Sequence, residues 1–119
     1  MTTAERYQSV SAQLFDQAHV ELEAGDLIQA SEKFWGATAQ ALKAIAHERG
    51  WEHKSHGNFY RIIRNLADET GDRQIRILFQ AADSLHANFY EHWMDREQIL
   101  ALADEVSHLL ERLNNIKNP

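Results

Sequence analysis

The 119-residue chain has the length of one domain; 44% of its residues are apolar and 25% are charged, with one proline and five glycines. This composition excludes collagen-like and wholly disordered chains. The absence of cysteine excludes a disulfide-stapled secreted domain and any zinc site that needs thiolates, and the net charge of −6 argues against a surface that is basic all round.

The first predicted helix begins near Thr2 or Thr3 and ends at Gly25. Its apolar residues recur at intervals of three and four, which places on one stripe Tyr7, Val10, Leu14, Ala18 and Leu22. Asp26 is suited to cap a second helix, which we expect over 27–49, before a stop at Gly50. The second helix is rich in alanine. Because small side chains let neighbouring helices approach closely, we expect it at the centre of the fold.

The polar stretch 51–57 predicts a connection, after which Ser55 or Asn58 caps a third helix that ends at Gly71. Asp72 then opens a fourth helix. The residues on its central stripe recur at intervals of four and three: Ile75, Phe79, Ala82, His86, Phe89 and Trp93.

Asp95 caps a fifth predicted helix, whose apolar residues stay in step as far as Ile116. No alternating strand pattern competes with the helices, and no linker divides the chain. We therefore predict an all-α fold: one domain over residues 1–119, built as a single compact bundle of about five antiparallel helices.

No run of 18 apolar residues is present, and the first ten residues lack the apolar core of an export signal. We therefore expect a cytoplasmic protein that does not bind membranes.

Seven histidines raise the question of a metal site. His53 and His56 are three residues apart and can face one ion on a tight turn, but a site needs a third ligand. No carboxylate–histidine pattern accompanies them, and the alternative is a solvated loop. We predict no metal and no cofactor.

The segment 85–92, LHANFYEH, places four polar groups among large apolar side chains: His86, Asn88, Tyr90 and His92. A histidine on an apolar stripe, such as His86, is commonly a core residue with a hydrogen-bonded ring. The alternative is that the four groups form the edge of a binding pocket or of a dimer interface.

Positive charge gathers in the middle of the chain. Between Lys43 and Arg64, five basic residues outnumber two acidic ones, a local balance of +3. Arginines such as Arg61 and Arg64 suit the geometry of phosphate, and Trp51 can stack on a base. The alternatives are that the cations oppose the dipole at the end of the second helix and that Trp51 is a hydrophobic cap.

One pair of residues suggests acid–base catalysis. Arg49 and His56 are separated by six residues, so that the arginine can hold a scissile phosphate while the histidine moves a proton during attack by a 2′-hydroxyl. The pair predicts a metal-independent endoribonuclease as the alternative to non-catalytic binding.

Two runs carry a family resemblance: GDLIQASEKFWGATAQALKAIA at 25–46 and LHANFYEH at 85–92. With the closing amphipathic helix they resemble the PaREP-type helical proteins, which in turn look like members of the HEPN (higher eukaryotes and prokaryotes nucleotide-binding) superfamily. The resemblance implies a bundle of about five helices, frequently dimeric, in a superfamily of nucleotide-binding modules, RNA-cleaving toxins and non-catalytic partners.

The active ribonucleases of that superfamily carry an arginine, four to six intervening residues, and a histidine on a late helix. No arginine stands at this spacing before His86 or His92, so the resemblance does not imply ribonuclease activity. We expect instead a non-catalytic HEPN-like module that binds a nucleotide, an RNA phosphate or a partner protein, as a homodimer and within a toxin–antitoxin or defence system. A helical protein-interaction scaffold is the third class, with contact candidates at Phe15, Ile77 and Trp51.

Overall fold

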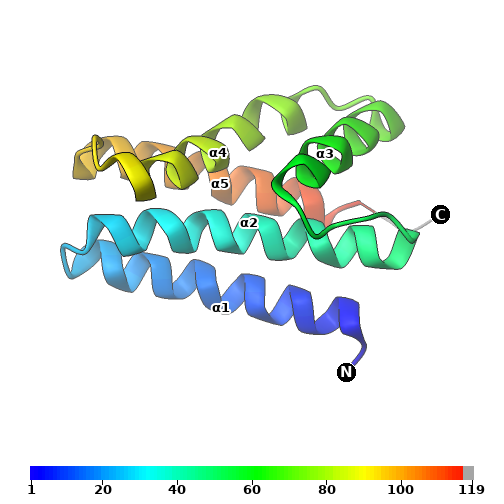
Figure 1. Cartoon of the computed structure of the whole chain (residues 1–119), viewed down its shortest axis with the longest axis horizontal. Coiled ribbons are helices and arrows are strands. Elements are labelled where there is room, and N and C mark those ends of the chain that lie inside the picture. Colours follow the sequence, from blue (N-terminus) through cyan, green and yellow to red (C-terminus); the bar gives the residue numbers. More distant parts are fainter. Residues whose placement is uncertain (117–119) are drawn as a thin grey trace.

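The computed structural model describes residues 1–116. It contains five α-helices: α1 (Thr3–Glu23), α2 (Leu27–Arg49), α3 (His56–Thr70), α4 (Gln74–Glu91) and α5 (Arg96–Asn114) (Figure 1). The described part of the chain has no strand, and the predicted all-α bundle is confirmed. None of the five helices is both long enough and apolar enough to cross a membrane.

Local side-chain chemistry sets most of the helix starts. Four helices begin at a capping side chain that accepts a hydrogen bond from a backbone N–H three residues later: Thr2, Asp26, Ser55 and Asp95. Ser55 caps α3, and Asn58 completes the capping box. The exception is α4, which begins at Gln74 without a side-chain cap; Asp72 accepts the Gln74 N–H instead.

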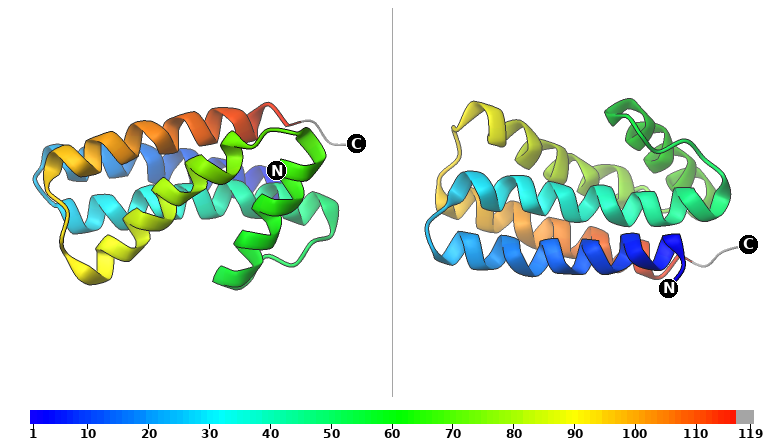
Figure 2. Two further views of the ribbon diagram at one scale, coloured as in Figure 1. Left: turned by 90° about the horizontal axis from the view of Figure 1, so that it is seen from above. Right: turned by 60° about the horizontal axis from the view of Figure 1, so that its bottom comes forward.

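The helices α1, α2 and α5 run along a common direction, and α4 lies obliquely to them; α2 lies between α1 on one side and α4 and α5 on the other (Figures 1 and 2). The shorter α3 crosses this direction at a steep angle (Figure 2). The prediction that α2 lies at the centre is confirmed. Its alanines allow the close approach, since four of them are buried almost completely: Ala30, Ala37, Ala44 and Ala46.

The core runs through all five helices, and its largest fully buried side chains include Phe34, Leu42, Ile62, Phe79, Ile99 and Leu109. Gly50 adopts the left-handed conformation, with φ of 71°, and ends α2. The chain then turns back along α2, so that α3 starts beside the middle of that helix (Figure 1). This reversal brings the first turn of α3 against α2 and α4.

Candidate functional site

Two histidines from different helices meet over a tryptophan from a third. His56, the first residue of α3, and His86 of α4 both lie nearly parallel to the indole of Trp35 in α2, at interplanar angles of 17° and 24°. Their ring centroids are 4.9 and 4.7 Å from that of the indole, and 5.2 Å from each other. Trp35 is only 6% exposed, so it forms a buried floor beneath the two imidazoles.

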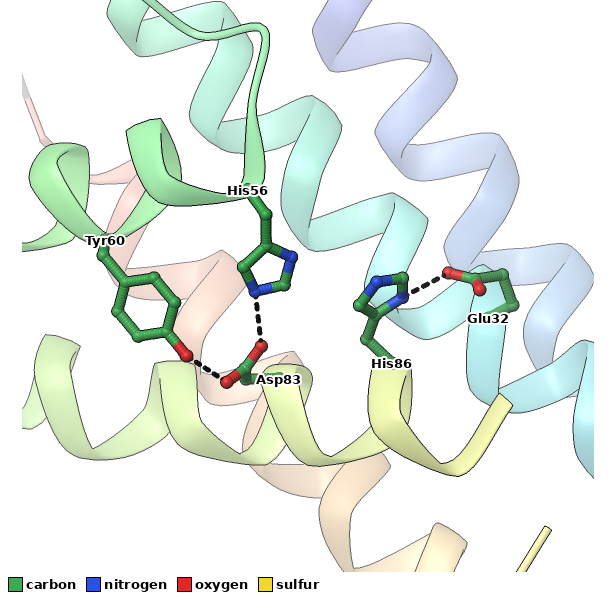
Figure 3. A network of polar contacts seen from close by, with 5 residues as sticks. All are labelled: Glu32, His56, Tyr60, Asp83 and His86. Carbon is green, nitrogen blue, oxygen red and sulfur yellow. Dashed lines mark hydrogen bonds and ion pairs between the residues drawn. The ribbon is translucent and has the colours of Figure 1, made fainter. Parts of the chain in front are cut away.

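A carboxylate holds each imidazole. Nε2 of His56 lies 2.8 Å from Oδ1 of Asp83, and Nδ1 of His86 lies 2.9 Å from Oε1 of Glu32 (Figure 3). An ionised carboxylate can only accept a hydrogen bond, so these two ring nitrogens carry the protons. The remaining nitrogens, Nδ1 of His56 and Nε2 of His86, lie on the sides of the rings that face each other (Figure 3). Neither has a partner among residues 1–116.

The two facing nitrogens change character with pH. In neutral rings they carry lone pairs and accept hydrogen bonds, whereas in protonated rings they become N–H donors. Histidine makes this change between pH 5 and pH 8. The site therefore offers two lone pairs to a ligand when both rings are neutral and two donors when both are protonated.

Two tyrosines line the rim of the site. The hydroxyl of Tyr60 donates to Oδ2 of Asp83, the oxygen that His56 leaves unused (Figure 3). This hydrogen bond, followed by burial and the negative charge of Asp83, raises the pKa of Tyr60 to about 12. Tyr90 packs edge-on against His86, with centroids 5.4 Å apart. Because Tyr60 and Tyr90 are 48% and 67% exposed, both rings are accessible beside the imidazoles.

The Tyr60 contact gives a first prediction. Wild-type protein should show one tyrosinate transition near pH 12, followed by ultraviolet absorbance, and Asp83→Asn should return it toward about 10, the ordinary value for tyrosine. Since folding raises this pKa, the contact stabilises the fold fully below about pH 10 and ceases to do so as the pH rises through about 12. Tyr60→Phe should abolish the late transition and Tyr90→Phe should retain it. A late transition that survives in Asp83→Asn contradicts the assignment.

The archaeal PaREP1/PaREP8 family matches residues 6–110 of the chain. The chain belongs to this family. It is also similar to a protein of Sulfolobus solfataricus whose crystal structure aligns with a TM-score of 0.74 at 25% identity, over 97% of this chain and 96% of that one. The comparison with curated proteins finds no match. The PaREP-type resemblance is confirmed.

The PaREP1/PaREP8 protein holds Arg49 and His56 in separate places. Nη1 of Arg49 lies 3.0 Å from Oε2 of Glu69, near the end of α3, and the guanidinium carbon lies 5.3 Å from the centroid of the Trp51 ring. His56 stacks on Trp35. Trp35 precedes Arg49 in α2 by fourteen residues, which is about 21 Å along the helix axis. The two residues of the predicted catalytic pair therefore do not share a site. Trp51 packs against the core beneath Arg49, as a hydrophobic cap does.

Two of the four predicted residues in segment 85–92 reach the site of the PaREP1/PaREP8 protein: His86 and Tyr90. Asn88 is fully buried and hydrogen-bonds to α2 and to the turn after α4. His92 has a left-handed backbone, with φ of 58°, and forms the C-cap of α4. Asn88 is therefore part of the buried hydrogen-bond network, whereas His92 stays exposed at the end of α4.

The predicted cations and the second loop histidine lie outside the histidine pair. Arg61 and Arg64 are exposed on α3 and form no ion pair with any described residue. His53 has other partners than His56: its Nδ1 lies 2.7 Å from the carbonyl oxygen of Trp51, and its ring packs edge-on against Tyr7 and His47. Within residues 1–116, no group of three or more histidine, aspartate or glutamate side chains is arranged to hold a metal ion.

Four residues of the site are absent from the sequence-based prediction: Glu32, Trp35, Tyr60 and Asp83. For two of them, the spacing in the sequence contains a signal that could have identified them. Tyr60 follows His56 by four residues and Asp83 precedes His86 by three, spacings that place each pair on one helix face. Glu32 and Trp35 come from α2, and no spacing relates α2 to residues of α3 or α4.

Proposed function

We propose that this protein is a HEPN-like module that binds RNA, with a phosphate group held by His56 and His86. The two unpartnered ring nitrogens that face each other carry this proposal (Figure 3). Once both rings are protonated, each nitrogen donates a charge-assisted hydrogen bond, and phosphate oxygens are strong acceptors for such bonds. Asp83 and Glu32 keep the rings oriented, so little conformational freedom is lost on binding.

The exposed side of α3 supports a polymeric ligand. Tyr60 and Arg64 follow His56 at intervals of four residues, so they continue the site along one side of the helix. Tyr60 offers a ring for base stacking, and Arg64 is an exposed cation without an ion-pair partner in the described chain. Arg61 lies on the adjoining exposed surface of α3. The resemblance to the HEPN superfamily points to the same class of ligand.

The proposal predicts salt-dependent RNA binding that changes with pH. Each phosphate contact with a single strand contributes about −0.7 to the slope of log affinity against log salt. For three phosphate contacts, from His56, His86 and Arg64, we expect at pH 6 a slope of about −2, or about a 16-fold loss of affinity from 50 to 200 mM salt. Neutral imidazoles make no such contact, so at pH 8 we expect the slope to fall to about −0.7, the contribution of Arg64 alone. Anisotropy of a labelled single-stranded RNA measures both values.

His108 provides a matched control because it is exposed on α5, away from the site. His86→Gln should weaken the slope at pH 6 by about 0.7, whereas His108→Gln should leave it unchanged. A slope that is the same at both pH values, or equal losses in the two variants, contradicts the proposal.

The same two nitrogens favour a second candidate function, metal-independent cleavage of RNA. One neutral and one protonated imidazole can act together, the first accepting the proton of a 2′-hydroxyl and the second donating a proton to the leaving 5′-oxygen. His86 thereby replaces Arg49 as the partner of His56. RNA fragments released in chelator by wild-type protein and His108→Gln, but by neither His56→Gln nor His86→Gln, would support cleavage. Uncut RNA in all four samples restricts the function to binding.

A further inference from the structure

A groove lies on the side of α2 opposite the histidine site. The α1–α5 groove, with a volume of about 440 Å³, is bounded by α1, α2 and α5. Ala44, which lines this groove, follows Trp35 by nine residues, and this spacing is half a turn around the helix. The groove shares no lining residue with the histidine site, so the two surfaces are independent.

Side-chain size explains the groove. Its floor is made of small residues from α1 and α2: Ala12, Ala41 and Ala44. Larger apolar side chains stand around them, and each packs against the core while remaining partly exposed: Phe15, Ile45, Leu110 and Ile116. The α5 wall extends from Ser107 to Asn114, about 10 Å along the helix axis, and Ile116 follows it. This length matches about two turns of another helix.

Acidic side chains surround the apolar floor. Asp16 on α1 and Glu111 on α5 stand on opposite walls, and Glu48 lies toward the end of α2. Neither Asp16 nor Glu111 forms an ion pair with another described residue. A ligand that fits this groove has an apolar centre with positive charge on both sides.

We infer that the α1–α5 groove is the docking site for an amphipathic helix of a partner protein, whose apolar stripe is flanked by lysine or arginine. Apolar residues at positions i, i+4 and i+7 of such a helix cover the alanine floor, and its flanking cations meet Asp16 and Glu111. A second copy of this chain fits less well, because it brings a net charge of −6 to an acidic rim.

Two synthetic helical peptides test this inference. Both carry the same leucine stripe, flanked by lysine in one peptide and by glutamate in the other, and fluorescence anisotropy reports their binding to the full chain. We expect the lysine peptide to bind about tenfold more tightly, since two rim contacts change from repulsion to attraction. Asp16→Lys/Glu111→Lys should reverse the preference.

The control double variant Glu23→Lys/Glu91→Lys makes the same change in net charge at exposed positions outside the groove. It should keep the preference for the lysine peptide. Ala12→Trp, at an exposed floor position, should fill the groove and weaken binding of the lysine peptide by about tenfold.

Three results would overturn the inference: no preference between the peptides, equal effects of the two double variants, or undiminished binding by Ala12→Trp. A wild-type dimer in sedimentation that Ala12→Trp dissociates would assign the groove to a second copy instead. RNA binding does not enter any of these outcomes. The inference about the groove and the proposed function of the histidine site are therefore tested separately.

Discussion

Replacing Asn88 by alanine should lower the free energy of unfolding by about 3 kcal/mol and Tm by about 12 °C. Asn88 is fully buried; its Nδ2 donates to Oγ of Ser31 at 3.0 Å, and its Oδ1 accepts the backbone N–H groups of Trp93 and Met94 at 2.9 Å each. Alanine removes all three hydrogen bonds and leaves the two backbone donors without that acceptor. Urea unfolding monitored by circular dichroism measures the loss.

Two further variants separate the parts of this network. Ser31→Ala removes only one bond to Asn88 and should cost about 1 kcal/mol. Asn88→Asp keeps an acceptor for the turn, but the Ser31 hydroxyl already donates to the carbonyl of Leu27 at 2.8 Å, so a buried carboxylate would face an acceptor oxygen. We therefore expect Asn88→Asp to destabilise as well. A stability of Asn88→Ala within about 0.5 kcal/mol of wild type would contradict the role assigned to the network.

Helix limits were predictable where neighbouring residues determine them. The sequence predicts α2 over 27–49, and the structure agrees because Asp26 and Gly50 act within one turn of the ends they define. The start of α4 was predicted two residues early. Asp72 does accept a hydrogen bond from the Gln74 backbone, but it lies outside the helix and is not its N-cap.

Charge and burial were less predictable, because both depend on residues far apart in the chain. The positive balance of 43–64 includes Arg49, but its partner Glu69 lies beyond that window and across a loop. The sequence predicts Asn88 as a binding residue because nothing in it indicates the hydrogen-bond partners of Asn88. These partners lie in α2 and in the turn after α4, and only the fold brings them together. His86 lies on the apolar stripe, as predicted, and its side chain remains 23% exposed between Trp35 and Glu32.

The second large effect is expected at Trp35. Trp35→Ala should cost about 4 kcal/mol of stability, since the indole is buried in the core and alanine leaves a cavity beneath both imidazoles. Urea unfolding measures this loss. Trp35→Leu fills much of that space and is the variant for binding experiments, because it removes the flat ring on which His56 and His86 lie while keeping the apolar contact.

Phe34→Leu is the matched control for Trp35→Leu. Phe34 is also a buried aromatic residue of α2, but its ring contacts are with Phe15 and His19 and not with the histidine pair. In RNA binding at pH 6, Trp35→Leu should reduce the salt slope from about −2 to about −0.7, because Arg64 alone then contacts phosphate in a fixed position. Phe34→Leu should lose stability and keep the wild-type slope. If both variants keep the wild-type salt slope, the indole stabilises the core but is not needed to orient the imidazoles. Asp83 and Glu32 then suffice to orient them.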